Sequence, residues 1–456
     1  MTYDILILGG GPGGYVAAIK GAQLGLKVAL IEKDNVGGVC LNEGCIPTKT
    51  LLKSAKVYRL IKHASNYGIH VDSNSVTFDW TDILNRKSKV IKTLTDGVKG
   101  LLKKNGVEVY NGYGEVIDPT TVKVDNEVIT SKHLILATGA SPVMPNIVGL
   151  KEAFERQFVY TYKGLLDYPK IPESLVIIGG GVIGLEFAQL FSSFGTKITI
   201  IERTEKILMT VDDDIRAAYL RILKKEKIEI ITSANVTEIK DNSVIYELNG
   251  ESHQAFSDIV LLSVGMKPNL ESFKSLNLEI TKQGVVVNKH LQTSIPSVYA
   301  IGDLTGKMML AHAASAQGMT AVETIAGQSS QFNFTDVPSA IYGFPEIAWI
   351  GLNEQTLKAQ NTPYKSSKFP LMANGRSLAE GETDGFVKVL INPDTGEILG
   401  AHIIASNASD LLAEVVLAIK SEATIAEVAN AIHLHPTVSE TVMESAIGAI
   451  HKHIHI

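Results

Sequence analysis

The chain has 456 residues, of which 45% are hydrophobic and 20% are charged, and its formal net charge is -6. This composition is typical of a globular protein, and the length suits about three folding units. The acidic balance and the lack of an arginine-rich run exclude a basic surface for nucleic acid, and charged residues interrupt each apolar stretch before it reaches the length of a membrane span.

The N-terminal segment Met1–Leu8 enters an apolar run at once, with no leader pattern before it, so we expect a cytoplasmic protein. The chain contains only two cysteines. They are too few for the disulfide framework of a secreted scaffold or, without added histidines, for a structural zinc site. The two thiols are therefore interpreted as either inert or redox active.

Two copies of one unit stand in the first half of the chain. The segment from Asp4 to Gly14 aligns without a gap on the segment from Ser174 to Gly184, and the match extends to Glu32 and Glu202. Each copy reads as an apolar run, a glycine cluster, a helical stretch and a second apolar run that ends in glutamate. This order predicts a βαβ unit, and each copy is expected to nucleate a doubly wound parallel sheet.

The glycine clusters predict two dinucleotide sites, because each has the spacing GxGxxG between a strand and a helix. The first glycine permits the tight turn, the second lets a pyrophosphate approach the backbone, and the third lets helix and strand pack closely. Glu32 and Glu202 are expected to accept hydrogen bonds from ribose hydroxyls, which favours NAD over NADP at the second site. The alternative, that the glycines only form turns, does not explain two copies in register. The motif glycines are Gly9, Gly11, Gly14, Gly179, Gly181 and Gly184.

Later segments predict how the domains close. Buried strands over 133–139 and 259–265 are expected to complete the first and second sheets, and a strand over 297–303, followed by a helix over 310–326, is expected to return to the first sheet. From Val337 onward the sequence pattern changes to alternating strands and helices, which predicts an α+β unit on an antiparallel sheet. Its expected strands cover 386–391 and 398–404, and its expected helices cover 410–420 and 425–431.

Both cysteines lie in the segment Gly37-Gly-Val-Cys-Leu-Asn-Glu-Gly-Cys-Ile-Pro-Thr-Lys49, directly after the first unit. Taken alone, the spacing C-x4-C is as consistent with an inert buried pair as with a redox pair. Its position beside a dinucleotide site favours a dithiol that exchanges two electrons with a bound flavin.

This segment closely resembles the redox-active segment of the flavoprotein pyridine nucleotide-disulfide oxidoreductases. With His433-Leu-His-Pro-Thr-Val-Ser-Glu440, the resemblance extends over essentially the whole chain and is greatest to the dihydrolipoamide dehydrogenase branch. It implies an α/β fold with two Rossmann-like dinucleotide-binding domains, for FAD and NAD, and a C-terminal α+β dimerisation domain. The expected division is 1–143 for the first part of the FAD domain, 144–267 for the NAD domain, 268–335 for the segment returning to the FAD domain, and 336–456 for the dimer interface.

The resemblance implies catalytic roles for six residues. Cys40 matches the thiol that exchanges with substrate, and Cys45 matches the thiol that contacts the flavin. Lys49 and Glu186 match a pair near flavin N5, although on sequence alone Glu186 is as consistent with a helix-surface acid. His435 matches the base that ionises the substrate thiol in the other subunit, and nothing but the resemblance favours it over His433. The catalytic set is Cys40, Cys45, His435, Glu440, Lys49 and Glu186, with Glu440 expected to orient the base.

The resemblance also implies cofactor contacts. The expected FAD contacts are Gly9, Gly11, Gly14, Glu32, Lys33, Gly38, Val39, Lys49, Gly114, Thr138, Gly139, Asp303, Met309, Leu310, Ala311 and His312. The expected NAD contacts are Gly179, Gly181, Val182, Ile183, Gly184, Glu186, Glu202, Val236 and Gly265. Val39 stands where the family usually has threonine, which puts FAD affinity in question, and Asp303 has the alternative of a helix cap.

The implied function is NAD-dependent oxidation of protein-bound dihydrolipoyl groups to the lipoyl disulfide, through the cysteine pair and FAD. The implied partners are a second copy of the chain and the lipoyl domains of 2-oxoacid dehydrogenase complexes or the glycine cleavage H-protein. No metal is expected, and the histidine-rich segment 451–456 is interpreted as a frayed tail.

Three alternatives remain. A glutathione-reductase-type enzyme is disfavoured because that branch has GxGxxA, a tyrosine gate and an arginine pair for NADP, where this chain has Gly184, Ile183 and Glu202. Mercuric reductase is disfavoured because the sequence has no C-terminal cysteine pair. A noncatalytic flavoprotein scaffold is disfavoured because both cysteines and His435 are present.

Overall fold

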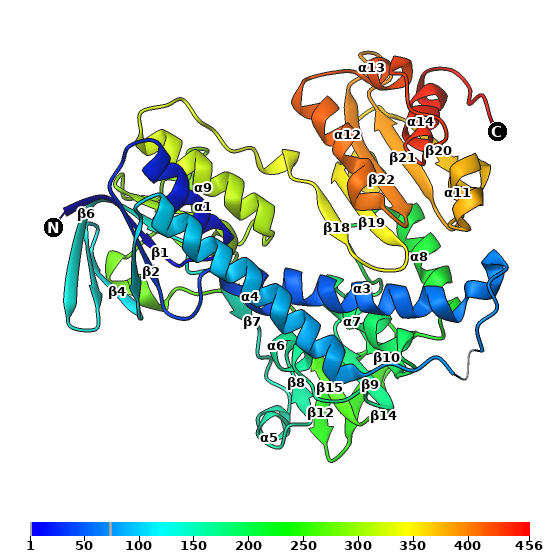
Figure 1. The fold of residues 1–456 in the computed structure, drawn as a ribbon, viewed down its shortest axis with the longest axis horizontal. Helices are drawn as coiled ribbons and strands as arrows, with labels where there is room; N and C mark the ends of the chain where they lie inside the picture. The colour runs from blue at the N-terminus through cyan, green and yellow to red at the C-terminus, as the bar shows by residue number, and fades with distance from the viewer. Residues whose placement is uncertain (1, 73–74) are drawn as a thin grey trace.

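A computed structural model of the protein describes residues 2–72 and 75–456. Its strands form three larger sheets, each flanked by helices, and the chain returns to the first sheet after completing the second (Figure 1). Among the described residues no helix is both long and apolar enough to cross a membrane.

The first sheet grows from the N-terminal βαβ unit. β1 pairs in parallel with β2 and with β6, β2 pairs with β3, and β17 pairs with the far side of β6. The pairing of β17 confirms the prediction that the strand near residue 300 returns to the first sheet. β5 and β4 extend the sheet as an antiparallel ribbon. The strands are β1 (Thr2–Leu8), β2 (Val28–Glu32), β3 (Glu108–Asn111), β4 (Gly114–Asp118), β5 (Thr121–Val124), β6 (Glu127–Leu136) and β17 (Val298–Ala300).

Two helices distant in sequence, α1 (Pro12–Gln23) and α9 (Ala311–Ile325), pack together beside this sheet (Figure 1). The contact is close because it is made at glycines: a Cβ on Gly318 would lie 2.5 Å from the carbonyl oxygen of Gly13. α9 covers almost the whole of the helix predicted over 310–326. The return segment is therefore held both by strand pairing and by helix packing.

A long helical pair, for which no element was predicted, runs between β2 and β3. It consists of α3 (Cys45–Lys62), preceded by the short α2 (Gly38–Glu43), and α4 (Trp80–Lys104). Asp79 caps α4 by accepting hydrogen bonds from the backbone N–H groups of Thr81 and Asp82. α3 packs on α4 and also on α7 (Val182–Ser193) of the second unit, so it joins two parts of the molecule (Figure 1).

The second sheet repeats the arrangement of the first. Its order is β11-β10-β9-β15-β8 with parallel pairing throughout, as the second βαβ unit predicted. A three-stranded antiparallel sheet, β12-β13-β14, and a two-stranded link, β16-β7, complete this part. The elements are β7 (Ala140–Pro142), α5 (Leu150–Glu155), β8 (Val159–Tyr160), α6 (Tyr162–Leu166), β9 (Ser174–Ile178), α7 (Val182–Ser193), β10 (Lys197–Ile201), α8 (Asp213–Lys225), β11 (Glu229–Ile231), β12 (Asn235–Lys240), β13 (Ser243–Leu248), β14 (Glu251–Phe256), β15 (Ile259–Leu262) and β16 (Met266–Pro268).

The third sheet is antiparallel, with the order β18-β19-β22-β21-β20. This confirms the predicted α+β unit, and β21 occupies the predicted range. The elements are β18 (Ser339–Ile341), β19 (Glu346–Gly351), α10 (Glu354–Ala359), β20 (Lys365–Pro370), α11 (Gly375–Glu380), β21 (Phe386–Ile391), β22 (Ile398–Ala405), α12 (Ala408–Lys420), α13 (Ile425–Asn430) and α14 (Glu440–Ile450).

The tail beyond α14 is docked, which differs from the expected frayed end. The backbone N–H of Ile454 and Nδ1 of His455 meet the carboxylate of Glu444, which is 3% exposed. His453 reaches the hydroxyl of Ser367 at 3.0 Å. The buried carboxylate needs hydrogen-bond donors, and the tail supplies them.

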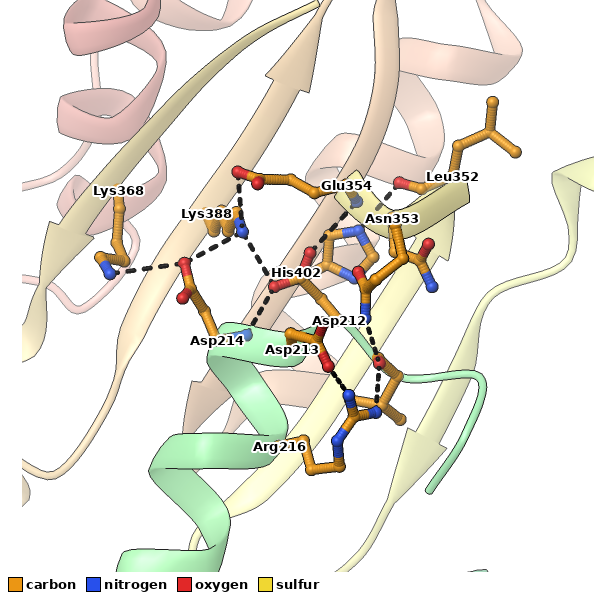
Figure 2. A network of polar contacts seen from close by, with 12 residues as sticks. Asp212, Asp213, Asp214, Arg216, Leu352, Asn353, Glu354, Lys368, Lys388 and His402 are labelled. Carbon is orange, nitrogen blue, oxygen red and sulfur yellow. Dashed lines mark hydrogen bonds and ion pairs between the residues drawn. The ribbon is translucent and has the colours of Figure 1, made fainter. Parts of the chain in front are cut away.

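A buried ion network joins the third sheet to the second unit. Lys388 on β21 lies between Asp212 and Asp214 at the start of α8 and Glu354 at the start of α10 (Figure 2). The Lys388 side chain is 3% exposed and that of Asp212 is 1% exposed. A buried charge of this kind is tolerated only when it is paired, so the two units are fixed to each other at this point.

Candidate active site

A cavity of about 1810 Å³ lies where the first and second sheets, α3 and the β18–β19 loop meet. The carboxyl ends of the first strands of both βαβ units open onto it, as is usual for ligand sites of parallel sheets. The predicted residues that line it are Gly9, Gly11, Glu32, Lys33, Gly38, Val39, Cys40, Cys45, Lys49, Gly114, Thr138, Gly139, Asp303, Met309, Leu310, Ala311, His312, Gly179, Gly181, Val182, Ile183, Glu186, Glu202, Val236 and Gly265.

Four predicted residues lie outside this cavity. Gly14 and Gly184 are the third glycines of the two motifs, which were expected to pack helix on strand. A Cβ would lie 1.8 Å from the carbonyl oxygen of Gly9 if placed on Gly14, and 2.4 Å from that of Gly179 if placed on Gly184. The other two, His435 and Glu440, belong to the C-terminal α+β unit that contains the third sheet, which is called the third unit below.

The second glycine of the second motif has the opposite surroundings. Gly181 stands at the N-terminus of α7 and lines the cavity, and no heavy atom lies within 4 Å of a Cβ placed on it. The backbone N–H groups of this helix start are therefore open to a phosphate. These residues fit a dinucleotide, because the space that a side chain would occupy is left free on the cavity side.

The two glutamates that follow the motifs are held in the same way. Glu32 accepts from the backbone N–H of Gly10 at 2.6 Å, and Glu202 accepts from the backbone N–H of Gly180 at 2.7 Å. Burial raises the pKa of Glu202, but hydrogen bonds from Thr204 and Gly180 outweigh burial and bring the pKa below its ordinary value. The carboxylate stays ionised and rigid at the rim where a ribose would lie, and it opposes a 2′-phosphate.

Cys40 and Cys45 are free thiols. Cys40 lies on the short helix α2, and Cys45 lies on the longer helix α3 that follows it. A side-chain hydrogen bond between them lowers the pKa of Cys45, and the charge of Lys49 lowers it further, although burial opposes both effects. The same hydrogen bond, together with burial, raises the pKa of Cys40. Cys45 is also the first residue of α3, where the helix dipole favours a thiolate. Ionisation of the pair is thus favoured at Cys45 and disfavoured at Cys40.

A buried carboxylate binds the lysine of this segment. Glu186 on α7 accepts from Nζ of Lys49 at 2.8 Å and 2.9 Å, and its side chain is 5% exposed. It also accepts from the backbone N–H of Tyr342 at 3.0 Å, and the Tyr342 ring lies 4.6 Å from Nζ of Lys49. Glu186 is therefore a buried acid and not a helix-surface one.

Asp303 lines the cavity from the short helix Gly302–Thr305 without capping that helix. Burial raises its pKa to about 6. Among the described residues none donates a hydrogen bond to this carboxyl group, so it fits a hydroxyl-bearing ligand that would supply one.

The two candidate bases differ in their hydrogen bonds. Nδ1 of His435 meets Glu440 at 2.9 Å, and the His435 side chain is 80% exposed. Because the carboxylate accepts the Nδ1 proton, Nε2 carries the lone pair of the neutral ring and can take a proton. In His433, Nδ1 meets the carbonyl oxygen of Ala431 and Nε2 meets Glu414, so neither nitrogen is free. The geometry favours His435 independently of any resemblance.

Sequence reasoning missed two residues: Tyr342, which lines the cavity, and Gln189, which lies outside its lining. Tyr342, which contacts both members of the Lys49–Glu186 pair, lies in a loop between strands and belongs to no motif. Gln189 lies one helical turn after Glu186, fully buried, and holds that loop on α7. A second polar residue, after Glu186, inside the mainly apolar stretch of α7 was the available signal. Among the described residues no group of His, Cys, Asp or Glu is arranged to hold a metal ion.

Comparison with known proteins covers nearly the whole chain. Residues 3–318 match the family model for pyridine nucleotide-disulphide oxidoreductases, and residues 337–446 match the dimerisation domain of the same family. The chain is 52% identical over 323 residues to the dihydrolipoyl dehydrogenase of Acholeplasma laidlawii, covering 71% of this chain and 96% of that protein. It is 41% identical over 475 residues to the dihydrolipoyl dehydrogenase of Bacillus subtilis, covering 99% of each. Among solved structures, the HOCl-induced flavoprotein disulfide reductase RclA of Escherichia coli aligns with a TM-score of 0.86 at 27% identity, covering 97% of this chain and 99% of that chain.

Proposed function

Because the chain belongs to the pyridine nucleotide-disulphide oxidoreductase family, we propose that it is an NAD-dependent dihydrolipoyl dehydrogenase, which oxidises protein-bound dihydrolipoyl groups to the lipoyl disulfide. One observation carries this proposal: Cys40, Cys45 and both glycine-rich motifs open onto a single cavity. A dithiol beside two dinucleotide sites suits the transfer of two electrons between a thiol substrate and a nicotinamide.

FAD bound at the first motif supplies the two-electron exchange between the cysteine pair and NAD+. The α1 N-terminus and Glu32 would hold its pyrophosphate and ribose, and Asp303 would accept from a hydroxyl group. NAD+ would lie at the second motif against Gly181 and Glu202.

The cysteines carry the exchange with substrate. In the oxidised protein a substrate thiolate attacks the sulfur of Cys40, the Cys40–Cys45 bond breaks, and Cys45 leaves as a thiolate. The second substrate thiol then attacks the mixed disulfide, which releases the lipoyl disulfide and returns Cys40 as a thiol. The hydrogen bond with Cys40 and the charge of Lys49 both stabilise the Cys45 thiolate and lower the pKa of Cys45.

A free thiol at neutral pH is mostly protonated, so the substrate needs a base. We assign this role to His435, oriented by Glu440, in the site of a second copy of the chain. The match to a dimerisation domain supports a homodimer. Two apolar residues shortly before His435 support it as well, because the side chains of Ile432 and Leu434 are largely exposed in one chain and a second copy would cover them.

The proposed partners beyond the second copy are lipoyl domains of 2-oxoacid dehydrogenase complexes or the glycine cleavage H-protein, and the proposed location is the cytoplasm. A cysteine pair that cycles between thiol and disulfide suits a reducing compartment.

The test uses purified, flavin-loaded protein with dihydrolipoamide and NAD+, following the absorbance of NADH. Activity is expected in the wild type and not in Cys40→Ser or Cys45→Ser. A Cys45→Ser protein that reduced NAD+ at the wild-type rate would overturn the proposal. Replacing free dihydrolipoamide by isolated reduced lipoyl domains from each complex then identifies the partner as the domain with the highest kcat/KM.

A further inference from the structure

Gln189 occupies a position at which its side-chain amide is completely used. It is 0% exposed and lies on α7 one turn beyond Glu186. Its Oε1 accepts from the hydroxyl of Tyr219 and from the backbone N–H of Phe344, both at 2.9 Å. Its Nε2 donates to the carbonyl oxygen of Phe344 and to Glu226, both at 3.0 Å. A buried amide with four partners fixes the relative positions of all of them.

The segment that Gln189 holds is the β18–β19 loop, residues 342–345. Two backbone N–H groups of this loop are bound by α7 side chains, that of Tyr342 by Glu186 and that of Phe344 by Gln189. At Gly343 the loop passes so close that a Cβ would lie 2.1 Å from Oε1 of Gln189. The loop therefore rests on the side chains of α7 with no room to shift toward the helix.

The same contacts reach α3, which begins at Cys45. Glu226, which accepts from Gln189, also forms an ion pair with Arg59 of α3. The guanidinium of Arg59 lies 5.0 Å from the ring of Phe344. The β18–β19 loop of the third sheet, helix α7 and helix α3, which begins at Cys45, thus meet around the buried side-chain amide of Gln189.

We propose that Gln189 is a positioning residue for the Lys49–Glu186 pair: by holding the 342–345 loop on α7 it keeps the ammonium group of Lys49 beside Cys45. The Tyr342 ring of the loop covers Lys49, and the backbone N–H of Tyr342 donates a hydrogen bond to Glu186. Displacement of the loop would therefore remove both contacts. The inference rests on the proposed function only in taking Cys45 as the thiolate of the redox pair.

The consequence for Cys45 follows from the groups that surround it. These are Cys40 on α2, Lys49 on α3, Glu186 on α7 and Tyr342 on the loop. Lys49 alone among them is a cation that stabilises the thiolate. A loosened loop lets Glu186 draw Lys49 into new positions, which weakens this stabilisation. We expect the apparent pKa of Cys45 to rise by about one unit, which is a roughly tenfold fall in thiolate below the pKa.

The test measures alkylation of Cys45 by iodoacetamide as a function of pH in the flavin-loaded protein. A Cys40→Ser background leaves Cys45 as the sole cysteine, since the chain has two, and the serine hydroxyl can still donate. In this background Gln189→Met is expected to move the midpoint of the profile upward by about one unit. Tyr219→Phe removes one of the four hydrogen bonds and is expected to give a smaller shift in the same direction.

The matched control is Lys388→Met, which weakens a different contact between the second and third units and should leave the Cys45 profile unchanged. A Gln189→Met protein whose profile coincides with that of its parent overturns the inference, and so does an equal shift in the Lys388→Met control. If Gln189→Met does not fold, Tyr219→Phe, which removes a hydrogen bond to Gln189 without adding a charge, decides in the same way: a profile that coincides with that of its parent overturns the inference. Because no lipoyl substrate is used, a shifted profile in a protein without lipoamide activity would refute the proposed function and leave this inference standing.

Discussion

Replacement of Lys388 by methionine removes the one cation at the centre of the network in Figure 2. Nζ of Lys388 lies 2.9 Å from Asp212, 3.0 Å from Asp214 and 3.1 Å from Glu354. Methionine fills nearly the same volume, so the change tests charge and not packing. It leaves the carboxylate of Asp212, which is 1% exposed, without its counter-ion.

The magnitude follows from burial. Removing one partner of a buried ion pair costs about 3–5 kcal/mol, because the remaining charge stays out of water. At about 2–4 °C per kcal/mol, this corresponds to a fall in Tm of roughly 6–20 °C. The matched control is Lys368→Met, since the Lys368 side chain is 50% exposed and lies 3.5 Å from Asp214. An exposed pair of this kind contributes less than about 1 kcal/mol.

Scanning calorimetry of the wild type and both variants measures the difference directly. The double variant Lys388→Met/Asp212→Asn should recover part of the loss, because it removes the stranded charge. Equal melting temperatures for Lys388→Met and Lys368→Met would show that the network carries no buried-charge cost, and the reasoning would then be wrong.

The network also makes an acid-dependent contribution. Burial raises the pKa of Glu354, but hydrogen bonds from Lys358 and Lys388 outweigh it and lower the pKa to about 2. A carboxyl group with a depressed folded pKa stabilises the protein fully above its unfolded pKa of about 4.3, and this contribution disappears as the pH falls toward 2. Denaturant unfolding measures the free energy of unfolding between these two pH values. We expect it to fall less steeply with decreasing pH in Lys388→Met than in the wild type. An equal slope would contradict the role of Lys388 in lowering the pKa of Glu354.

Three further predictions concern the proposed function. His435→Gln should lower kcat for dihydrolipoamide oxidation roughly 10²–10⁴-fold, whereas His433→Gln should leave it nearly unchanged, and equal losses would contradict the assignment of the base. Gly14→Ala places a Cβ against the carbonyl oxygen of Gly9 and should lower the FAD retained per chain after dialysis, so full flavin absorbance would contradict the packing argument. Glu202→Gln should raise the KM for NAD+ by roughly tenfold or more and lower the ratio of kcat/KM for NAD+ to kcat/KM for NADP+. An unchanged ratio would exclude a preference for NAD+ based on the charge of Glu202.

The features predictable from sequence depend on short stretches of chain. A βαβ unit with a glycine cluster is encoded within one strand, one turn and one helix, so both copies were predicted from the apolar pattern and the repeated glycine motif. β21 was predicted for the same reason, since its apolar run is bounded by turn residues. A redox role for Cys40 and Cys45 could also be proposed from sequence, because the two cysteines directly follow the first βαβ unit, although their spacing alone left an inert pair open.

Other parts of the site form only when the units pack. Lys388 and Asp212 lie on separate units, and no periodicity in either segment indicates the other. Gln189 and Tyr342 are likewise brought together by a loop that returns to α7 from a distant sheet. The local sequence pattern indicates which face of an element is buried. The partner of a buried polar group is set by tertiary packing, because an unpaired polar group costs free energy only once packing removes it from water. The sequence by itself therefore determined the two nucleotide-binding units and the dithiol, whereas the tertiary structure decided which charges and amides hold them in register.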